Sequence, residues 1–107
     1  MAATYAEKRA ASGQLANSLT TIYTASSVTA LLTQLWLYNT STTNAEKITI
    51  AINDGVDITI ATLTLQPLEY GIVELKGMAL NASDLIKAFA DDATTVNYVL
   101  SLVEKTA

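Results

Sequence analysis

Apolar and polar residues alternate with a period of two through much of the chain, as expected for β-strands that bury one face. The alternation is clearest over residues 47–53, where Ile48, Ile50 and Ile52 share one side. These three side chains are predicted to face the core while the intervening polar residues face water. The Asp54-Gly55 pair that follows favours a tight hairpin turn, because glycine tolerates positive φ.

A long apolar run over residues 27–39 is predicted to be the central strand of the protein, and neither of its faces is plainly polar. One face would carry Val28, Ala30, Leu32, Gln34, Trp36 and Tyr38, and the other Thr29, Leu31, Thr33, Leu35, Leu37 and Asn39. One face can form the domain core. We therefore expect the other face to be covered by another subunit or by the protein's own terminal arm.

The closing segment, residues 94–104, has the same two-sided character. Its alternation places one apolar set on one face and a second set on the other, and these sets are Val96, Tyr98, Leu100 and Leu102 against Val99 and Val103. A closing strand that is apolar on both sides again predicts contacts beyond the core of a single domain.

Further strands are predicted over residues 19–24, 56–65 and 68–75. The alternation slips near Ala61-Thr62, which predicts a bulge or a change of sheet there. Residues 85–90 fit either a helix or a strand, and we favour the strand because every secure element around them is β. About eight antiparallel strands separated by turns predict an all-β, single-domain β-sandwich of jelly-roll-like form.

Residues 1–13 are predicted to be an N-terminal arm, with the sandwich domain at residues 14–107. The arm has enough helix formers for one or two helical turns, but so short an isolated helix is marginal in water. We therefore expect an extended arm that orders only against another surface. Its paired basic residues, Lys8 and Arg9, favour a partner surface that is acidic or polar.

The composition narrows the possible functions. The 107 residues fit one domain, and the chain has no Cys and no His, which removes thiol nucleophiles, imidazole bases and most transition-metal ligands. A net charge of −4 argues against nucleic acid, which requires a basic surface. No stretch is typical of a secretory signal or a membrane-spanning helix, so we expect synthesis in a cytoplasm and no membrane contact.

Carboxylates are the remaining candidates for chemistry. Asp54 and Asp57 lack the spaced ligands of a calcium loop and are interpreted as turn formers. Glu69, Glu74 and Glu104 would make a glycosidase pair only if a cleft brought two of them together, and no pattern indicates a cleft. We therefore predict no enzymatic activity, no metal and no cofactor.

Two aromatic residues of the central strand allow two interpretations. Trp36 and Tyr38 are the residue types that stack on sugars in carbohydrate-binding modules. They also suit a core or a subunit interface. Their place in the most apolar strand favours the core or the interface.

The order of the predicted strands and turns from Gly13 onward resembles that of a family of small virion proteins from tailed bacteriophages. In that family, a strand with the pattern tLYT precedes a long strand that ends with the pattern N.t. A hairpin follows, and a later turn with the pattern l..gD.I leads to the closing strand. The resembling segments are Gly13-Gln14-Leu15, Thr21-Ile22-Tyr23-Thr24, Leu35-Trp36-Leu37-Tyr38-Asn39-Thr40-Ser41, Ala82-Ser83-Asp84-Leu85-Ile86 and Val96-Asn97-Tyr98. The chain departs from the family at Ser83 and Ser101, where the family has glycine.

The resemblance implies a jelly-roll-like sandwich that binds as a homotrimer to the outer shell of a virion and stabilises it, as a capsid decoration or cement protein does. Its partners would be further copies and the major capsid protein or another virion protein, in particles made in the host bacterial cytoplasm. Alternatives are a tail, neck or fibre-base component, and a carbohydrate-binding or host-attachment module. The residues expected at protein interfaces are Lys8, Arg9, Leu31, Leu35, Trp36, Leu37, Tyr38, Val99 and Val103.

Overall fold

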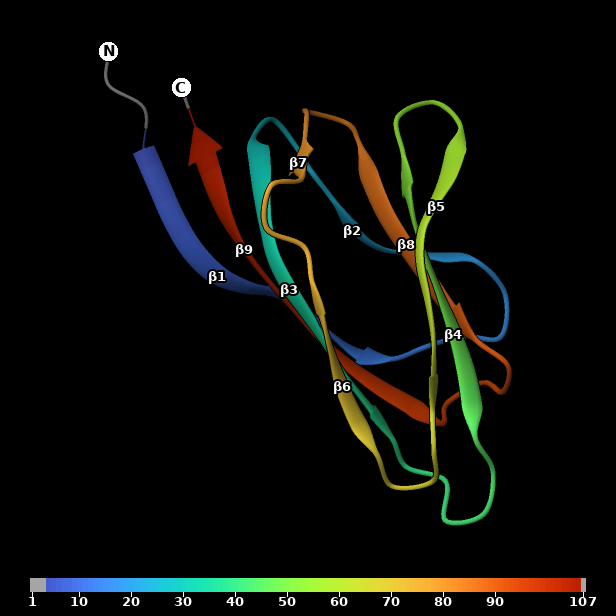
Figure 1. Ribbon diagram of the computed structural model, residues 1–107. Coiled ribbons are helices and arrows are strands. Elements are labelled where there is room, and N and C mark those ends of the chain that lie inside the picture. The colour runs from blue at the N-terminus through green and yellow to red at the C-terminus, as the bar shows by residue number, and fades with distance from the viewer. Residues whose placement is uncertain (1–3, 107) are drawn as a thin grey trace.

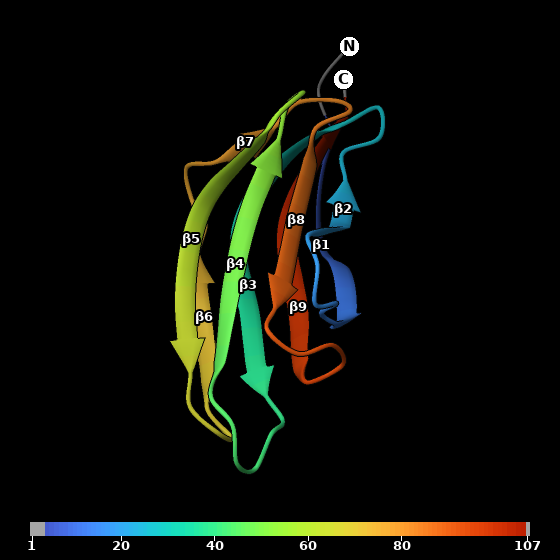
Figure 2. The same ribbon diagram turned by 90° about the vertical axis from the view of Figure 1, so that its right-hand side faces the viewer.

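The computed structural model describes residues 4–106, which form nine β-strands and no helix. Sheet A contains β1 (Thr4–Gln14), β9 (Val96–Thr106), β3 (Thr29–Asn39), β6 (Tyr70–Glu74) and the short β7 (Ala79–Leu80). Sheet B contains β2 (Thr20–Thr24), β8 (Leu85–Ala90), β4 (Glu46–Asn53) and β5 (Asp57–Leu65). The two sheets face each other as a sandwich (Figure 1 and Figure 2).

The strand order is that of a jelly roll and confirms the predicted fold class. Sheet A runs β1-β9-β3-β6, with β7 beside β3, and sheet B runs β2-β8-β4-β5. Every pairing between these neighbours is antiparallel. The first and last strands of the chain are therefore neighbours in sheet A, and the chain repeatedly crosses between the sheets, as in a double-sheet jelly roll.

The predicted alternation in β4 places its isoleucines in the core. Ile48 and Ile50 are fully buried, and Ile52 is partly buried and packs against the core. The hairpin to β5 closes through Gly55, whose φ of 123° lies in the region that favours glycine. The predicted hairpin and core face are both confirmed.

The face assignment predicted for β3 is wrong in part, because a β-bulge interrupts the strand. Its pairing with β9 shifts register between Leu32 and Gln34. A bulge adds one residue and turns the following side chains to the opposite face. The core therefore receives Ala30 and Leu32 before the bulge and Leu35 after it. Simple alternation cannot anticipate this exchange of faces.

Residues 4–13 of the expected arm lie in β1, an edge strand of sheet A, and the alternative of a short helix is wrong for them. The strand pairs with β9 from Thr4, opposite Thr106, to Gln14, opposite Asn97. The surface that orders these residues is thus the last strand of the same chain. β1 widens sheet A sideways and does not cover its outer face (Figure 1).

The two ambiguous stretches of sequence are both resolved as strand. Residues 85–90 form β8, with Ile86, Ala88 and Ala90 buried and Lys87 and Phe89 between them on the outer side. The slip in alternation expected near Ala61-Thr62 is a bulge: the register of β4 and β5 shifts between Ile50 and Ala51. The helical reading of residues 85–90 is therefore excluded.

The molecule is elongated, with principal extents of 53 × 26 × 20 Å. The start of β1 and the end of β9 lie side by side at one end of the long axis (Figure 1). Within residues 4–106 no helix has the length and apolar character needed to span a membrane.

Candidate functional site: the outer face of sheet A

Sheet A presents a broad apolar surface to solvent. Cross-strand pairs place side chains of neighbouring strands on the same face, so the register defines this surface. One row joins Val99, Trp36 and Ile72, and a second joins Val103, Leu31 and Ala79. We call the outward side of sheet A, comprising these rows and the outward residues of β1, the sheet A face.

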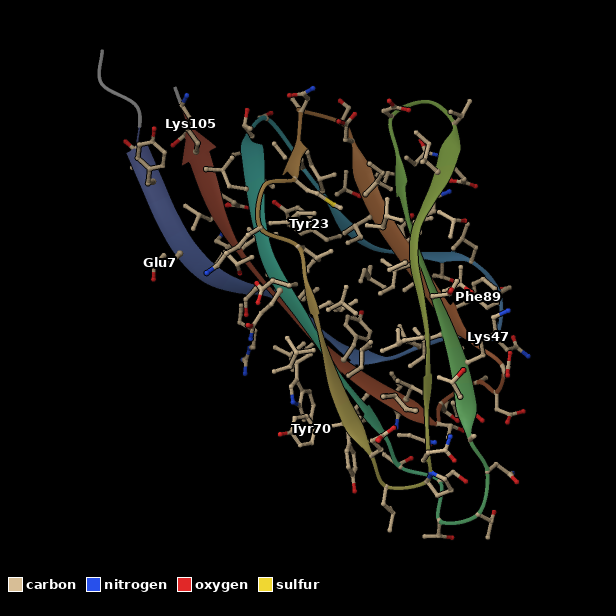
Figure 3. All side chains as sticks on the ribbon, in the orientation of Figure 1. Glu7, Tyr23, Lys47, Tyr70, Phe89 and Lys105 are labelled. Atoms are coloured by element: carbon tan, nitrogen blue, oxygen red, sulfur yellow. The ribbon has the colours of Figure 1, made fainter. Side chains whose placement is uncertain are left out.

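The apolar side chains of the sheet A face are large and substantially exposed. Tyr70 and Ile72 of β6 are 63% and 50% exposed, and Tyr5 of β1 is 61% exposed. Figure 3 shows Tyr70 directed away from sheet B. Trp36 and Tyr38 are half-buried beside Tyr70 and Ile72, with ring centroids 6.2 Å apart and planes 12° from parallel. Tyr5 lies towards the other end of the sheet, opposite Lys105. Exposed apolar side chains grouped on one face mark a candidate site of contact with another molecule.

The outer face of sheet B has a different composition. Its outward positions are mainly threonine and lysine, and the register aligns Thr49 with Thr62 and Lys47 with Thr64. Lys87 of β8 pairs with Asp57 of β5 at 2.9 Å. Phe89 and Lys47 lie on the far side of the molecule from Tyr70 (Figure 3). This contrast between the faces identifies the sheet A face as the candidate interface.

Six of the nine residues expected at interfaces lie on the sheet A face. They are Arg9, Leu31, Trp36, Tyr38, Val99 and Val103. Leu35 and Leu37 do not, because the bulge in β3 turns both into the core, where they are 0% exposed. A side chain buried within its own subunit has no surface left for a partner, so these two residues are core residues.

Lys8 lies on the opposite side of β1 from Arg9. It pairs with Leu102, which faces inward, and its Nζ lies 2.8 Å from Glu104. The Tyr23 hydroxyl donates a second hydrogen bond to the Glu104 carboxylate at 2.5 Å. The hydrogen bond from Lys8 lowers the pKa of Glu104, and the hydrogen bond from Tyr23 lowers it further. Burial raises the pKa of Tyr23, and the contact with the Glu104 carboxylate raises it further. Lys8 is therefore engaged within its own chain.

Among the residues of the sheet A face that sequence reasoning missed are all three outward residues of β6. Tyr70, Ile72 and Glu74 are paired with Tyr38, Trp36 and Gln34, respectively, and all three are exposed. Their period-two spacing was visible in the predicted strand over residues 68–75. That spacing does not show which side of the strand lies inward, so only the pairing with β3 places them.

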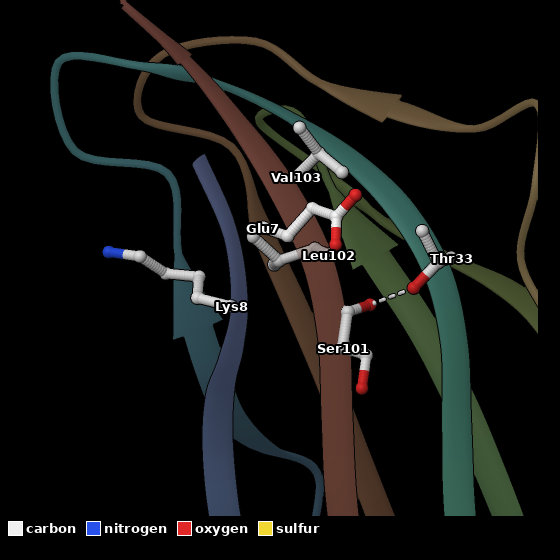
Figure 4. A pocket seen from close by; sticks show the side chains of 6 residues that line it. All are labelled: Glu7, Lys8, Thr33, Ser101, Leu102 and Val103. Atoms are coloured by element: carbon white, nitrogen blue, oxygen red, sulfur yellow. Dashed lines mark hydrogen bonds between the residues drawn. The ribbon is translucent and has the colours of Figure 1, made fainter. Parts of the chain in front are cut away.

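A shallow hollow of about 440 Å³ opens on the sheet A face. Figure 4 shows its lining, which comprises Glu7, Lys8, Thr33, Ser101, Leu102 and Val103. The Thr33 hydroxyl donates to the Ser101 carbonyl at 2.8 Å, and the bulges of β1 and β3 flank the hollow. The chain has no histidine to activate the Ser101 hydroxyl. Lys8, which also lines the hollow, is held by Glu104, so the hollow is a depression between β1, β9 and β3 on the candidate interface.

A buried carboxyl group lies at the start of β4. Glu46 is 0% exposed; its Oε1 accepts the Asp92 N–H at 2.9 Å, and its Oε2 has no partner among the described residues. Burial raises the pKa of Glu46, and the neighbouring carboxylates of Asp92 and Asp91 raise it further. Within residues 4–106 no three carboxylates are arranged to hold a metal ion.

Comparisons with solved structures show the same fold. The chain is similar to one in the acidic stable capsid structure of the Helicobacter pylori bacteriophage KHP30, with a TM-score of 0.59, 14% identity, and coverage of 98% of this chain and 88% of that one. It is also similar to a chain of the disulfide-linked pili that form Bacillus endospore appendages, with a TM-score of 0.51, 10% identity, and coverage of 98% and 87%. No protein-family model and no curated protein matches the chain. At these identities the similarity shows a shared sandwich fold, found in a capsid and in a pilus.

Proposed function

We propose that this protein is a structural component of a virion that works by assembly, without catalysis, and that it decorates the outside of a capsid as a cement protein. The observation that carries the proposal is the sheet A face, which exposes rows of large apolar side chains on a jelly roll whose other outer face carries mainly threonine and lysine. Such a face requires a partner in the working state. The fold similarity to a phage capsid chain supports a virion as the setting.

The physical role of a cement protein follows from linkage. A protein that binds the assembled shell but not its separate subunits raises the free energy of disassembly by its own binding free energy at every site. A net charge of −4 also disfavours binding to packaged nucleic acid. The resemblance implies a homotrimer, whose copies would meet through two different surfaces, whereas a contact of the sheet A face with itself would give a twofold dimer. Sedimentation equilibrium distinguishes the two assemblies.

The proposal is tested by adding the purified protein to undecorated tailed-phage capsids and sedimenting them. We expect the protein to co-sediment at a fixed number of copies per shell and to raise the temperature at which the shell disrupts. Protein that stays in the supernatant with every shell tested would contradict the decoration role and favour a tail, neck or fibre-base position.

One observation favours a second candidate, a carbohydrate-binding or host-attachment module. Trp36, Tyr38 and Tyr70 lie on one face, and Tyr70 is paired directly with Tyr38. Aromatic rings on a sheet face are a common platform for sugar rings. Calorimetric titration with host surface oligosaccharides tests this candidate. Saturable binding that is lost in Tyr70→Ala would establish it in place of the structural role.

A further inference from the structure

The arrangement of charges on the sheet A face carries an inference about which molecule covers it. Four outward positions form one row across the sheet: Arg9 pairs with Ser101, Ser101 with Gln34, and Gln34 with Glu74. Arg9 lies on one edge strand and Glu74 on the other. The row therefore carries a positive charge at one end and a negative charge at the other, with two neutral polar residues between.

Among residues 4–106, neither of these charged side chains forms an ion pair. Arg9 and Glu74 are both exposed, and among the described residues the ion pairs are Lys8 with Glu104 and Lys87 with Asp57. Three strand spacings of about 4.8 Å separate β1 from β6, which is too far for the two side chains to pair across their own sheet. Each is left to pair with another molecule.

We propose that the partner is a second copy of this chain, packed face to face on the sheet A face about a twofold axis that runs along the strands between β9 and β3. This axis places β1 of one copy over β6 of the other. Arg9 then lies over the second copy's Glu74, and by symmetry Glu74 lies over its Arg9. A twofold contact needs a self-complementary surface, and this row supplies one.

The apolar rows obey the same symmetry. The Val99–Trp36 row and the Val103–Leu31 row lie on either side of the charged row. The twofold axis places Val99 of one copy over Trp36 of the other, and Val103 over Leu31. Apolar residues therefore meet apolar residues on both sides of the row, Ser101 of one copy lies over Gln34 of the other within it, and opposite charges meet at its two ends.

The size and charge of the face also fit a second copy. β1, β9 and β3 have 11 residues each and β6 has five. At about 3.3 Å per residue and about 4.8 Å between strands, they cover roughly 600 Å² before side-chain relief is counted. A stable dimer buries about 800 Å² of accessible surface on each partner. The face carries Glu7, Arg9, Glu74 and Lys105 and so has no net charge, which removes the repulsion that two chains of net charge −4 would otherwise meet.

This inference deepens the proposed structural role by naming the surface through which copies meet, but its test needs no shell. Sedimentation equilibrium of the full chain at low salt should give about 23 kDa, twice the 11.4 kDa of one chain. A monomer throughout the micromolar range would overturn the inference. A trimer would overturn it as well, yet would leave the decoration role standing.

Charge exchange tests the direction of the axis. Arg9→Glu alone and Glu74→Arg alone should each weaken the dimer about tenfold, because each change sets like charges against each other at both ends of the row. The double variant Arg9→Glu/Glu74→Arg should restore the wild-type affinity. Lys47→Glu is the control on the other face and should leave the affinity unchanged. Two weak single variants without restoration in the double variant would overturn the proposed axis.

A third variant tests the apolar centre. Trp36→Ala should weaken the dimer at least tenfold, since aromatic residues at the centre of an interface carry much of its affinity. Circular dichroism and thermal unfolding of each variant verify that the sandwich is intact. A folded Trp36→Ala protein that dimerises with wild-type affinity would show that the copies meet through another surface.

Discussion

Ser83 adopts a backbone conformation that side chains with a Cβ disfavour. Its φ is 79°, and it is the third residue of a turn closed by the Asp84 N–H donating to the Asn81 carbonyl at 2.9 Å. Glycine is preferred at this position of a turn because it lacks the Cβ that causes strain. The chain therefore carries a strained serine where the resembling phage family has glycine.

We predict that Ser83→Gly stabilises the protein by roughly 0.5 to 1 kcal/mol. The relief of backbone strain favours the folded variant and outweighs the greater conformational freedom that glycine gives the unfolded chain. Chemical denaturation of the two proteins measures the difference. Ser83→Ala is the matched control: it keeps the Cβ and should leave the free energy of unfolding unchanged. Equal stability of the glycine and alanine variants would show that the positive φ costs nothing here.

Glu46 sets a stability that depends on pH. Its folded-state pKa lies above that of the unfolded chain, because burial disfavours the charged form and Oε2 has no partner. The folded protein thus holds the proton more tightly than the unfolded chain, so this group's contribution to stability is full below its unfolded pKa, near 4.5. The contribution is lost as the pH rises through the folded-state pKa.

We predict that Glu46→Gln increases the free energy of unfolding at pH 7, by roughly 1 to 2 kcal/mol. The amide oxygen can still accept the Asp92 N–H, and the side chain no longer has a charge to bury. Denaturation at several pH values tests this, since the advantage over wild type should shrink towards pH 4.5. An advantage that is constant with pH would mean that folding does not shift the pKa of Glu46.

At the scale of elements, β1 is an edge strand with few apolar contacts. Its residues 4–9 are exposed, whereas Ala10 and Ala11 pack against the core. Its main structural effect is to pair with the edge of β9, a strand that is apolar on both faces. An unpaired β9 would be a template for pairing with other chains.

We predict that deleting residues 1–12 leaves a folded sandwich that is less stable by roughly 1 to 3 kcal/mol and tends to aggregate through β9. Circular dichroism, thermal unfolding and light scattering measure the three effects. Lys8→Met is the matched control, since it removes the pairing with Glu104 and keeps the strand; it should cost less than about 1 kcal/mol. A truncated protein as stable and soluble as the full chain would show that β1 is dispensable for the fold.

At the scale of the whole molecule, association and folding are linked. If the sheet A face is covered only when two copies meet, the dimer is stabilised by mass action and the monomer is not. We predict that the midpoint of thermal unfolding rises by a few degrees for each tenfold increase in protein concentration. Arg9→Glu should reduce this dependence. Scanning calorimetry over two decades of concentration tests it, and a constant midpoint would contradict a dimer that persists to the unfolding temperature.

Much of the fold could be predicted because burial leaves a periodic trace in the sequence. The isoleucines of β4, the Asp-Gly turn and the two faces of β9 were each identified from local pattern alone, as was the all-β class. The candidate interface was found in part: Trp36, Tyr38, Val99 and Val103 stood out because an apolar residue on the second face of a strand needs its own partner.

What only the tertiary structure decided depends on contacts between residues far apart in the chain. The bulge in β3 exchanges its faces, which puts Leu35 in the core, and it appears only in the pairing with β9. Residues 4–14 form a strand because β9, nearly one hundred positions later, lies alongside them. The row from Arg9 to Glu74 exists only through three separate registers. Local periodicity indicates which residues are buried. The register between strands is set by packing across the sheet, between residues far apart in the chain, so a local pattern does not show it.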